Sequence, residues 1–219
     1  MIDDKYTYPG TGGVLVNRLG IRDADQLDSV LNEMASSKWA GMLRRGWPQE
    51  FTSDTLREVH RHLFREILPF AGELRDVDAQ AVGVGIVYCR PDYIAPALDE
   101  AFGKLRRRDY LAGLEADAFA AGLAEHWGEL SAIHPFRDGN TRSQCAYVSA
   151  LAASAGHPIR WSDVDVDQMR TRRLIAVAGD EGPLATYVGS VLGSADDPVQ
   201  RLMFFRRGTH DRSGGRGIV

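Results

Sequence analysis

Cysteine is almost absent from this chain, which has only Cys89 and Cys145 in 219 residues. The two residues lack the spacing of a metal site, so they give no argument for bound zinc or for a disulfide framework. Both lie in apolar segments, where a cysteine usually packs as a small hydrophobic residue rather than acting as a nucleophile. They are compatible with a reducing compartment.

Long apolar runs and an excess of basic charge are also missing. No run of about 18 apolar residues indicates a membrane span. The net charge of −4 argues against a general nucleic-acid binder, because such binding needs a basic face. Residues 1–4 are acidic and unlike a signal peptide, so we expect a cytoplasmic protein.

What the chain does have is enough apolar material for one core. Its hydrophobic content is 44%, which predicts a single domain over residues 1–195. Residues 196–219 are rich in glycine and arginine near their end, and we expect them to form a flexible tail. They could also be a partner-binding arm or the remainder of a longer protein.

Hydrophobic periodicity predicts a mainly helical fold. Helices are expected at residues 24–35, 53–67, 91–106, 114–133, 142–155, 163–178 and 183–192. Ser53 is the expected cap of the second helix. His60 and His62 within it are two residues apart and share no helical face, so we expect surface or packing roles rather than a metal site. Residues 80–88 are β-branched and spaced by glycine, which predicts one short β-hairpin.

The segment from His134 to Arg142 concentrates the groups that phosphate chemistry needs. Neutral His134 can accept a proton, and Asp138 can hold Mg²⁺ together with substrate phosphate oxygens. Gly139 and Asn140 precede an alanine-rich helix, whose N-terminus offers backbone N–H groups and a positive dipole end to an anion. Arg142 can bind a second phosphate through its guanidinium.

Each of these features has an ordinary alternative when it is taken alone. His-Pro often enters a loop, Asp-Gly-Asn is a common turn, and an arginine in a first helical turn usually points to solvent. Their joint occurrence between two helical segments favours a functional site, because the spacing leaves all four groups facing one small volume.

This segment resembles the signature of the Fic family, His-Pro-Phe-x-Asp/Glu-Gly-Asn-Gly-Arg-x-x-Arg. Residues 6–11 and 14–21 resemble the amino-terminal segment of bacterial Fic toxins and of the Fic modules of secreted effectors, and residues 70–75 resemble the family's Trp/Phe-Ala-Gly-x-Ile/Leu-Arg box. The likeness covers most of residues 6–195. It implies a mainly helical Fic domain acting as a protein adenylyltransferase, which transfers AMP from ATP to a hydroxyl side chain of a target protein with Mg²⁺ as cofactor.

The resemblance also implies roles for the matching positions. His134 is the expected general base for the target hydroxyl, and Asp138 is the expected Mg²⁺ ligand. The expected nucleotide-binding residues are Gly139, Asn140, Thr141 and Arg142. The first two of these would line an anion hole at the α-phosphate, and the arginine would contact the β- or γ-phosphate. The hydroxyl would attack the α-phosphorus in line, and pyrophosphate would leave.

Two positions depart from the family signature. Thr141 stands where the second glycine is usual, and Cys145 stands where the last arginine is usual. A β-branched side chain at 141 occupies space near a diphosphate, although its hydroxyl can donate a hydrogen bond. A bulky residue there accompanies an inverted nucleotide in Doc toxins, so a Doc-like protein phosphotransferase is one alternative. A degenerate Fic domain that only binds a partner or nucleotide is the other, and the intact His134 and Asp138 argue against it.

Residues 80–88 match the flap of Fic proteins, a hairpin that holds the target's modified segment by strand pairing. Ile86 and Tyr88 are the expected target contacts. The chain lacks the family's inhibitory motif, Ser/Thr-x-x-x-Glu-Gly/Asn; at its one Glu-Gly, Val177 stands where Ser or Thr is needed. We therefore expect either inhibition in trans by a small antitoxin-like protein or a constitutively active effector module. An effector would be translocated into a host cell.

Overall fold

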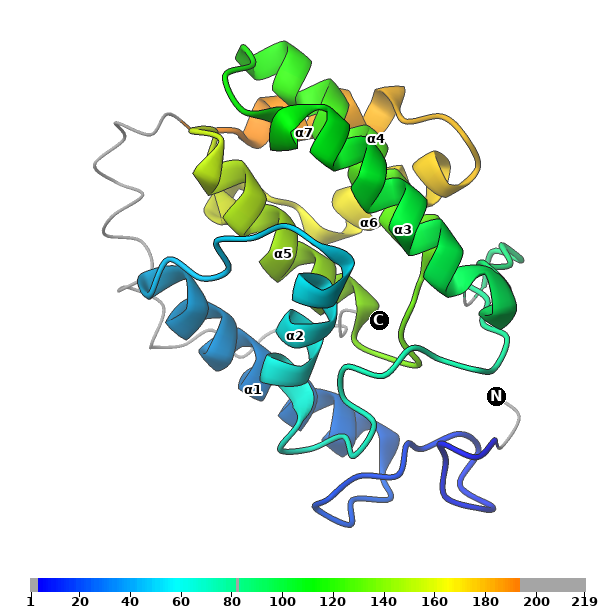
Figure 1. Ribbon diagram of the computed structural model, residues 1–219. Helices are drawn as coiled ribbons and strands as arrows, with labels where there is room; N and C mark the ends of the chain where they lie inside the picture. Colours follow the sequence, from blue (N-terminus) through cyan, green and yellow to red (C-terminus); the bar gives the residue numbers. More distant parts are fainter. Residues whose placement is uncertain (1–3, 82, 194–219) are drawn as a thin grey trace.

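The computed structural model describes residues 4–81 and 83–193, and nearly all of the regular structure in them is helical (Figure 1). The α-helices are α1 (Ala24–Arg44), α2 (Ser53–Phe64), α3 (Pro91–Arg107), α4 (Ala116–Ile133), α5 (Asn140–Ser154), α6 (Val166–Val177) and α7 (Gly182–Val191), with short 3₁₀ turns η1 (Asp109–Leu111) and η2 (Trp161–Asp163). The predicted helical fold is therefore confirmed.

Helix α4 is the centre of the larger of two hydrophobic clusters and contacts α3, α5, α6 and α7. Its predicted apolar stripe of Phe119, Leu123, Trp127 and Leu130 is completely buried. Burying large apolar side chains is the main favourable contribution to folding, so α4 is the element around which the others pack.

Helix α5 connects this cluster with a second one, formed by α1, α2 and the N-terminal segment. Ala146 packs into the second cluster while its neighbour Tyr147 packs into the first, and both are fully buried. Figure 1 shows α5 beside α2. Because the start of α5 lies between two packed cores, the loop that precedes it is held from both sides.

The helix starts follow capping chemistry. The side chain of Asp165 accepts a hydrogen bond from the Gln168 backbone N–H at the start of α6, as expected for carboxylates there. The cap of α2 differs from the prediction by one residue, because the Thr52 side chain accepts from the Thr55 N–H while Ser53 is already helical. Thr52 and Ser53 are both good caps, so the sequence alone did not distinguish them.

The predicted hairpin at residues 80–88 is not confirmed as a pair of strands. Gln80 and Val87 form an isolated antiparallel bridge, and the Ala81 N–H donates to the Ile86 carbonyl at 2.8 Å. The Tyr88 N–H also donates to the Ala79 carbonyl at 3.1 Å, and Gly83 and Gly85 have positive φ where the chain reverses, so the segment turns back on itself with one bridge in place of two strands.

Among the described residues, no helix is both long and apolar enough to cross a membrane. The tail expected at residues 196–219 lies outside the part of the chain that the structure describes.

Candidate active site

The loop between α4 and α5 and the first turn of α5 together carry every residue predicted from the motif. Helix α4 ends at His134, whose backbone is left-handed, with φ 48° and ψ 61°, and whose N–H donates to the Leu130 carbonyl. A histidine in this conformation is uncommon and marks a position that its surroundings must hold. Helix α5 then begins after Gly139, which is also left-handed, with φ 74°.

Asn140 and Phe136 hold the loop in shape. The Asn140 side-chain oxygen accepts from the Phe136 N–H at 2.9 Å, and its amide nitrogen donates to the Phe136 carbonyl at 2.7 Å. Both residues are buried. The side chain of Asn140 therefore stabilises the loop, while the first backbone N–H groups of α5 have no intrahelical partner.

His60 supports the same loop from α2. Its Nδ1 accepts from the Gly72 N–H at 2.8 Å, and its Nε2 lies 2.9 Å from the Asp138 carbonyl, so the ring is neutral and protonated on Nε2. Burial lowers the pKa of His60 to about 4. The ring also stacks on Phe136 with centroids 3.9 Å apart. The sequence predicted only a surface or packing role for His60, since nothing in it links this residue to residue 138.

Asp138 and Arg142 form an ion pair, with Arg142 Nη2 at 2.9 Å from Asp138 Oδ2. The Arg142 guanidinium is also held from α1, where Asn32 Oδ1 accepts at 2.9 Å and Asp28 Oδ1 at 3.5 Å. Its side chain is only 10% exposed. The expected metal ligand and the expected phosphate clamp thus neutralise each other.

The geometry fits a magnesium ion that arrives with its nucleotide. No group of three or more His, Cys, Asp or Glu side chains gathers in residues 4–81 and 83–193. The Asp138 side chain is partly exposed and sits on the loop where phosphates are expected. Mg²⁺ is usually bound by one or two carboxylates, substrate phosphates and water, so a single carboxylate suffices.

The ring of His134 lies against Tyr88, with centroids 3.7 Å apart and ring planes 9° from parallel. Burial lowers the pKa of His134 to about 3, with further lowering by the charges of Arg173 and Arg75, while a hydrogen bond to the Ser131 backbone opposes the shift. The imidazole is therefore neutral at physiological pH and able to accept a proton. Tyr88, a predicted flap residue, does reach the site.

Two buried arginines that sequence analysis did not assign to the site lie beside His134. Arg75 is 2% exposed and donates to the carbonyls of His134 and Val77 at 2.8 and 2.7 Å. Arg173, from α6, is 6% exposed and donates to Thr141 Oγ1 at 3.1 Å. Arg75 belongs to the box at residues 70–75, which was the only signal for it; Arg173 is one of several arginines in α6, and no local pattern distinguishes it.

The remaining predicted positions stand as follows. Thr141 is half-buried at the second position of α5. Ile86 is half-buried in the bridge segment, and its role as a target contact stays a prediction. Cys145 is buried, and burial raises the pKa of its thiol to about 11, which confirms packing rather than nucleophilic chemistry.

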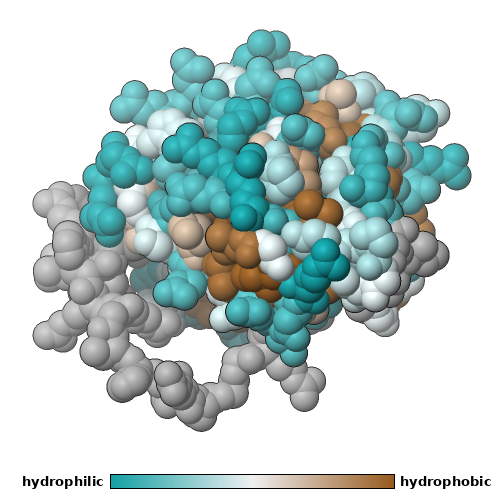
Figure 2. All heavy atoms as spheres, turned by 90° about the horizontal axis from the view of Figure 1, so that it is seen from below, coloured by the Kyte–Doolittle hydropathy of each residue, from teal (hydrophilic) through white to brown (hydrophobic). Residues whose placement is uncertain are grey.

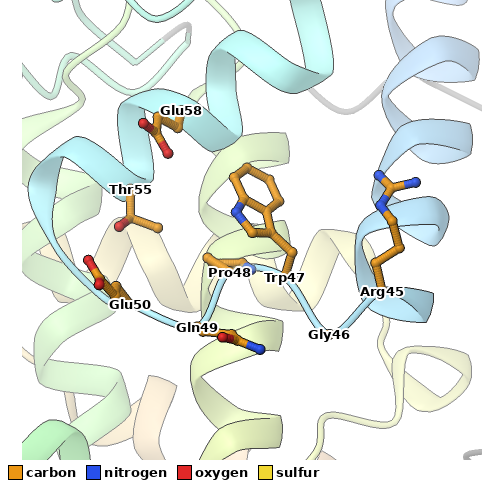
Figure 3. A pocket seen from close by; sticks show the side chains of 8 residues that line it. All are labelled: Arg45, Gly46, Trp47, Pro48, Gln49, Glu50, Thr55 and Glu58. Atoms are coloured by element: carbon orange, nitrogen blue, oxygen red, sulfur yellow. The ribbon is translucent and has the colours of Figure 1, made fainter.

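A separate hollow of about 310 Å³ lies where α1 leads into α2 (Figure 3). Residues from Arg45 to Glu50 line it together with Thr55 and Glu58 of α2. None of the predicted site residues lines this hollow, so it is distinct from the loop between α4 and α5.

Comparison with known proteins gave consistent matches. The model of the Fic/DOC family matches residues 50–152. A probable protein adenylyltransferase of Sinorhizobium fredii is 33% identical over 85% of this chain and 95% of its own length. The probable protein adenylyltransferase Fic of Escherichia coli is 30% identical over 89% and 94%. The crystal structure of BepC, a translocated effector of Bartonella tribocorum with bound AMPPNP, is similar in fold, with a TM-score of 0.79 at 24% identity over 86% of this chain and 96% of its own.

Proposed function

The chain belongs to the Fic/DOC family and is a protein adenylyltransferase, and from this premise we propose which of its residues carry out the transfer of AMP. The observation that carries the proposal is the placement of His134. Its neutral imidazole lies on the loop that leads into the N-terminus of α5, where Asp138 and Arg142 also lie.

In the proposed reaction His134 is the general base. It accepts the proton of the target hydroxyl as the hydroxyl oxygen bonds to the α-phosphorus of ATP. The bond from that phosphorus to the bridging oxygen of the β-phosphate breaks, and pyrophosphate leaves with the electron pair. Stacking on Tyr88 and the left-handed backbone hold the imidazole in one orientation, which supplies positioning before the reaction begins.

The N-terminus of α5 is the proposed site for the α-phosphate. Backbone N–H groups in the first turn of a helix have no intrahelical partners and point toward an anion. Gly139 and Asn140 shape this turn, and Asn140 does so through its two hydrogen bonds to the Phe136 backbone. Donors that are already in place stabilise the charge that develops on the phosphate without reorganisation.

Asp138 would hold Mg²⁺ and Arg142 the β- or γ-phosphate. When bound, the ion supplies positive charge that neutralises the phosphate oxygens. The ion pair between the two side chains would open as each one took its own ligand, so neither charge would be left without a partner. Asp28 and Asn32 keep the Arg142 guanidinium oriented during this exchange.

The target protein would dock at residues 79–88. An extended segment of the target could pair with the backbone around the Gln80–Val87 bridge, which would place its hydroxyl beside the Tyr88 and His134 rings. Val84 and Val87 in this segment are strongly exposed, at 52% and 66%, and offer apolar contacts. The proposed form of regulation is inhibition in trans by a small antitoxin-like protein.

The test is the mass of proteins in a lysate incubated with the purified chain, Mg²⁺ and ATP. We expect an AMP-sized gain on one or more target proteins. His134→Ala should reduce the rate at least about 100-fold, since a positioned base typically contributes that much. His62→Ala is the matched control, because His62 lies on α2 and contacts Trp47, in the connection between α1 and α2, and not the loop.

Other outcomes would contradict the proposal in different ways. A phosphate-sized gain would mean that the nucleotide binds in the inverted, Doc-like orientation. A gain that persists in His134→Ala would show that another group is the base. No gain at all, with the folded chain still binding nucleotide, would indicate a binding module.

A further inference from the structure

Arg173 places a positive charge inside the molecule with no negative partner. Its three donor groups all bind neutral oxygens: Nε donates to Ser131 Oγ at 3.1 Å, Nη1 to Thr141 Oγ1 at 3.1 Å, and Nη2 to Gln144 Oε1 at 2.7 Å. None of the ion pairs among the described residues includes Arg173. Buried cations are normally paired with a carboxylate, so this arrangement calls for an explanation.

The unbalanced charge is directed at the active site. Together with burial, it lowers the pKa of His134. At Tyr88 and at Cys145 on α5 it opposes burial, which is the larger effect and raises the pKa of both groups. Cys145 is also the position where the family signature has an arginine. The structure therefore brings a guanidinium to this face of α5 from α6 instead of from α5 itself.

Thr141 connects this charge with the surface of the site. Its oxygen accepts from Arg173, which leaves the single hydroxyl proton available for another acceptor. Within residues 4–81 and 83–193 no oxygen or nitrogen accepts that proton. Thr141 is half-buried in the first turn of α5, where the backbone N–H groups also have no intrahelical acceptor. A hydroxyl whose oxygen is bound by a cation is a stronger donor than a free one.

We propose that Arg173 is a positioning residue for nucleotide phosphate, acting through the Thr141 hydroxyl. Arg173 orients that hydroxyl so that it donates to a phosphate oxygen of ATP, and the arriving phosphate supplies the negative charge that Arg173 lacks. The threonine at 141 thereby becomes a phosphate ligand instead of an obstacle. This inference rests on the proposed function, because it concerns the same nucleotide site.

The test measures binding of AMPPNP with Mg²⁺ by calorimetry, which requires no transfer of AMP. We expect Thr141→Val and Arg173→Met each to raise the Kd about tenfold, because each variant loses one hydrogen bond to a charged phosphate. The double variant should bind about as well as either single one, since both remove the same interaction. Thr141→Ser should keep wild-type affinity, and Arg173→Lys should recover part of it. Arg172→Met is the control, since Arg172 is on the same helix but its guanidinium lies over Tyr187.

Thermal unfolding of each variant separates this role from a structural one. A lower melting temperature with unchanged Kd in Arg173→Met, or effects that multiply in the double variant, would overturn the proposal. If Arg173→Met fails to fold, the affinities of Thr141→Val and Arg173→Lys test the proposal in its place. Unchanged affinity in Thr141→Val would overturn the inference. Absence of binding by the wild-type chain also overturns it. Binding of AMPPNP without transfer of AMP would leave this inference standing and contradict the proposed function alone.

Discussion

At the scale of single residues, Gly139 shows why the loop tolerates so little change. Its φ of 74° is in the left-handed region, and a Cβ built on it would lie 2.5 Å from Cε2 of Phe64. Two independent constraints, conformation and space, thus require glycine here. Phe64 also lies under the Arg142 guanidinium, at 5.2 Å from ring centroid to Cζ, so displacing its ring disturbs the phosphate clamp.

We expect Gly139→Ala to lower the free energy of unfolding by about 2 to 4 kcal/mol, combining the left-handed strain with overpacking against Phe64. AMP transfer should fall more than tenfold, because small displacements in an active site are costly. Gly156→Ala is the matched control. Gly156 has φ 86° but no atom within 4 Å of the added Cβ, so Gly156→Ala should lower the free energy of unfolding by only about 1 kcal/mol, from the left-handed strain alone. Chemical denaturation measures both, and equal losses would contradict the role of Phe64.

The acidity of His134 predicts an unusual pH dependence. Since its pKa is lowered to about 3, the base stays neutral as the pH falls, and the acid limb of kcat/KM shifts to lower pH. Between pH 7.5 and 5.5 we expect a change of less than about twofold, whereas a histidine of ordinary pKa would lose about tenfold. Initial rates on the target identified by mass measure this, with saturating Mg²⁺. A limb centred near pH 6.5 would refute the prediction.

At the scale of elements, Arg75 joins segments that are distant in the sequence. Besides the carbonyls of His134 and Val77, it donates to those of Ile133 and Cys89. It therefore links the end of α4 to both sides of the bridge segment at residues 79–88. Buried carbonyls need partners, and one planar guanidinium with five donors satisfies four of them.

Arg75→Met should lower the free energy of unfolding by at least about 3 kcal/mol, because several buried carbonyls lose their donor. Arg75→Lys should lower the free energy of unfolding less than Arg75→Met does, because the ammonium can still donate to some of the four carbonyls. It cannot reach all four, so some loss remains. Arg57→Met is the control: Arg57 is more exposed and its Nε donates to a single carbonyl, that of Gly72. Denaturation measures the three variants. A loss in Arg75→Met no larger than in Arg57→Met would show that the link contributes little.

At the scale of the whole molecule, apolar burial and surface charge are clearly divided. The face seen in Figure 2 is mostly hydrophilic, with hydrophobic residues gathered in a patch near its middle. In the interior, histidines are buried in their neutral form. His126 is 4% exposed, packs against Phe102 and Tyr147, and has a pKa lowered to about 3 by burial.

Buried neutral histidines predict loss of stability in acid. Below pH 6.5 the unfolded chain binds a proton at His126 that the folded chain does not, so the free energy of unfolding falls as the pH falls from about 6.5 toward about 3. By pH 5 this one residue contributes a loss of about 2 kcal/mol. His126→Leu should reduce the difference in unfolding free energy between pH 8 and pH 5 by that amount. An unchanged difference would show that His126 is protonated in the folded state.

The sequence by itself determined the helices and the order of chemical groups in the loop. Helical periodicity and caps depend on residues a few positions apart, which is why the stripe on α4 and the carboxylate at the start of α6 agree with the structure. The predicted first residue of that helix, 163, was wrong by three positions, because residues 161–163 form the 3₁₀ turn η2 and α6 begins at Val166. The segment from His134 to Arg142 is equally local, and its resemblance to the Fic signature is confirmed by the family match. The structure of residues 80–88 was harder to predict, because strand pairing depends on the surrounding tertiary structure.

Only the tertiary structure decided what surrounds the loop. His60 binds the carbonyl of Asp138, Arg75 binds that of His134, and Arg173 binds Thr141. The partners in these pairs are 78, 59 and 32 residues apart. No periodicity or spacing predicts such contacts, because they exist only once α2, α4, α5 and α6 have packed and brought these buried polar groups within reach of one another. The proposed catalytic groups are therefore local in sequence, while their ionisation and orientation depend on distant residues.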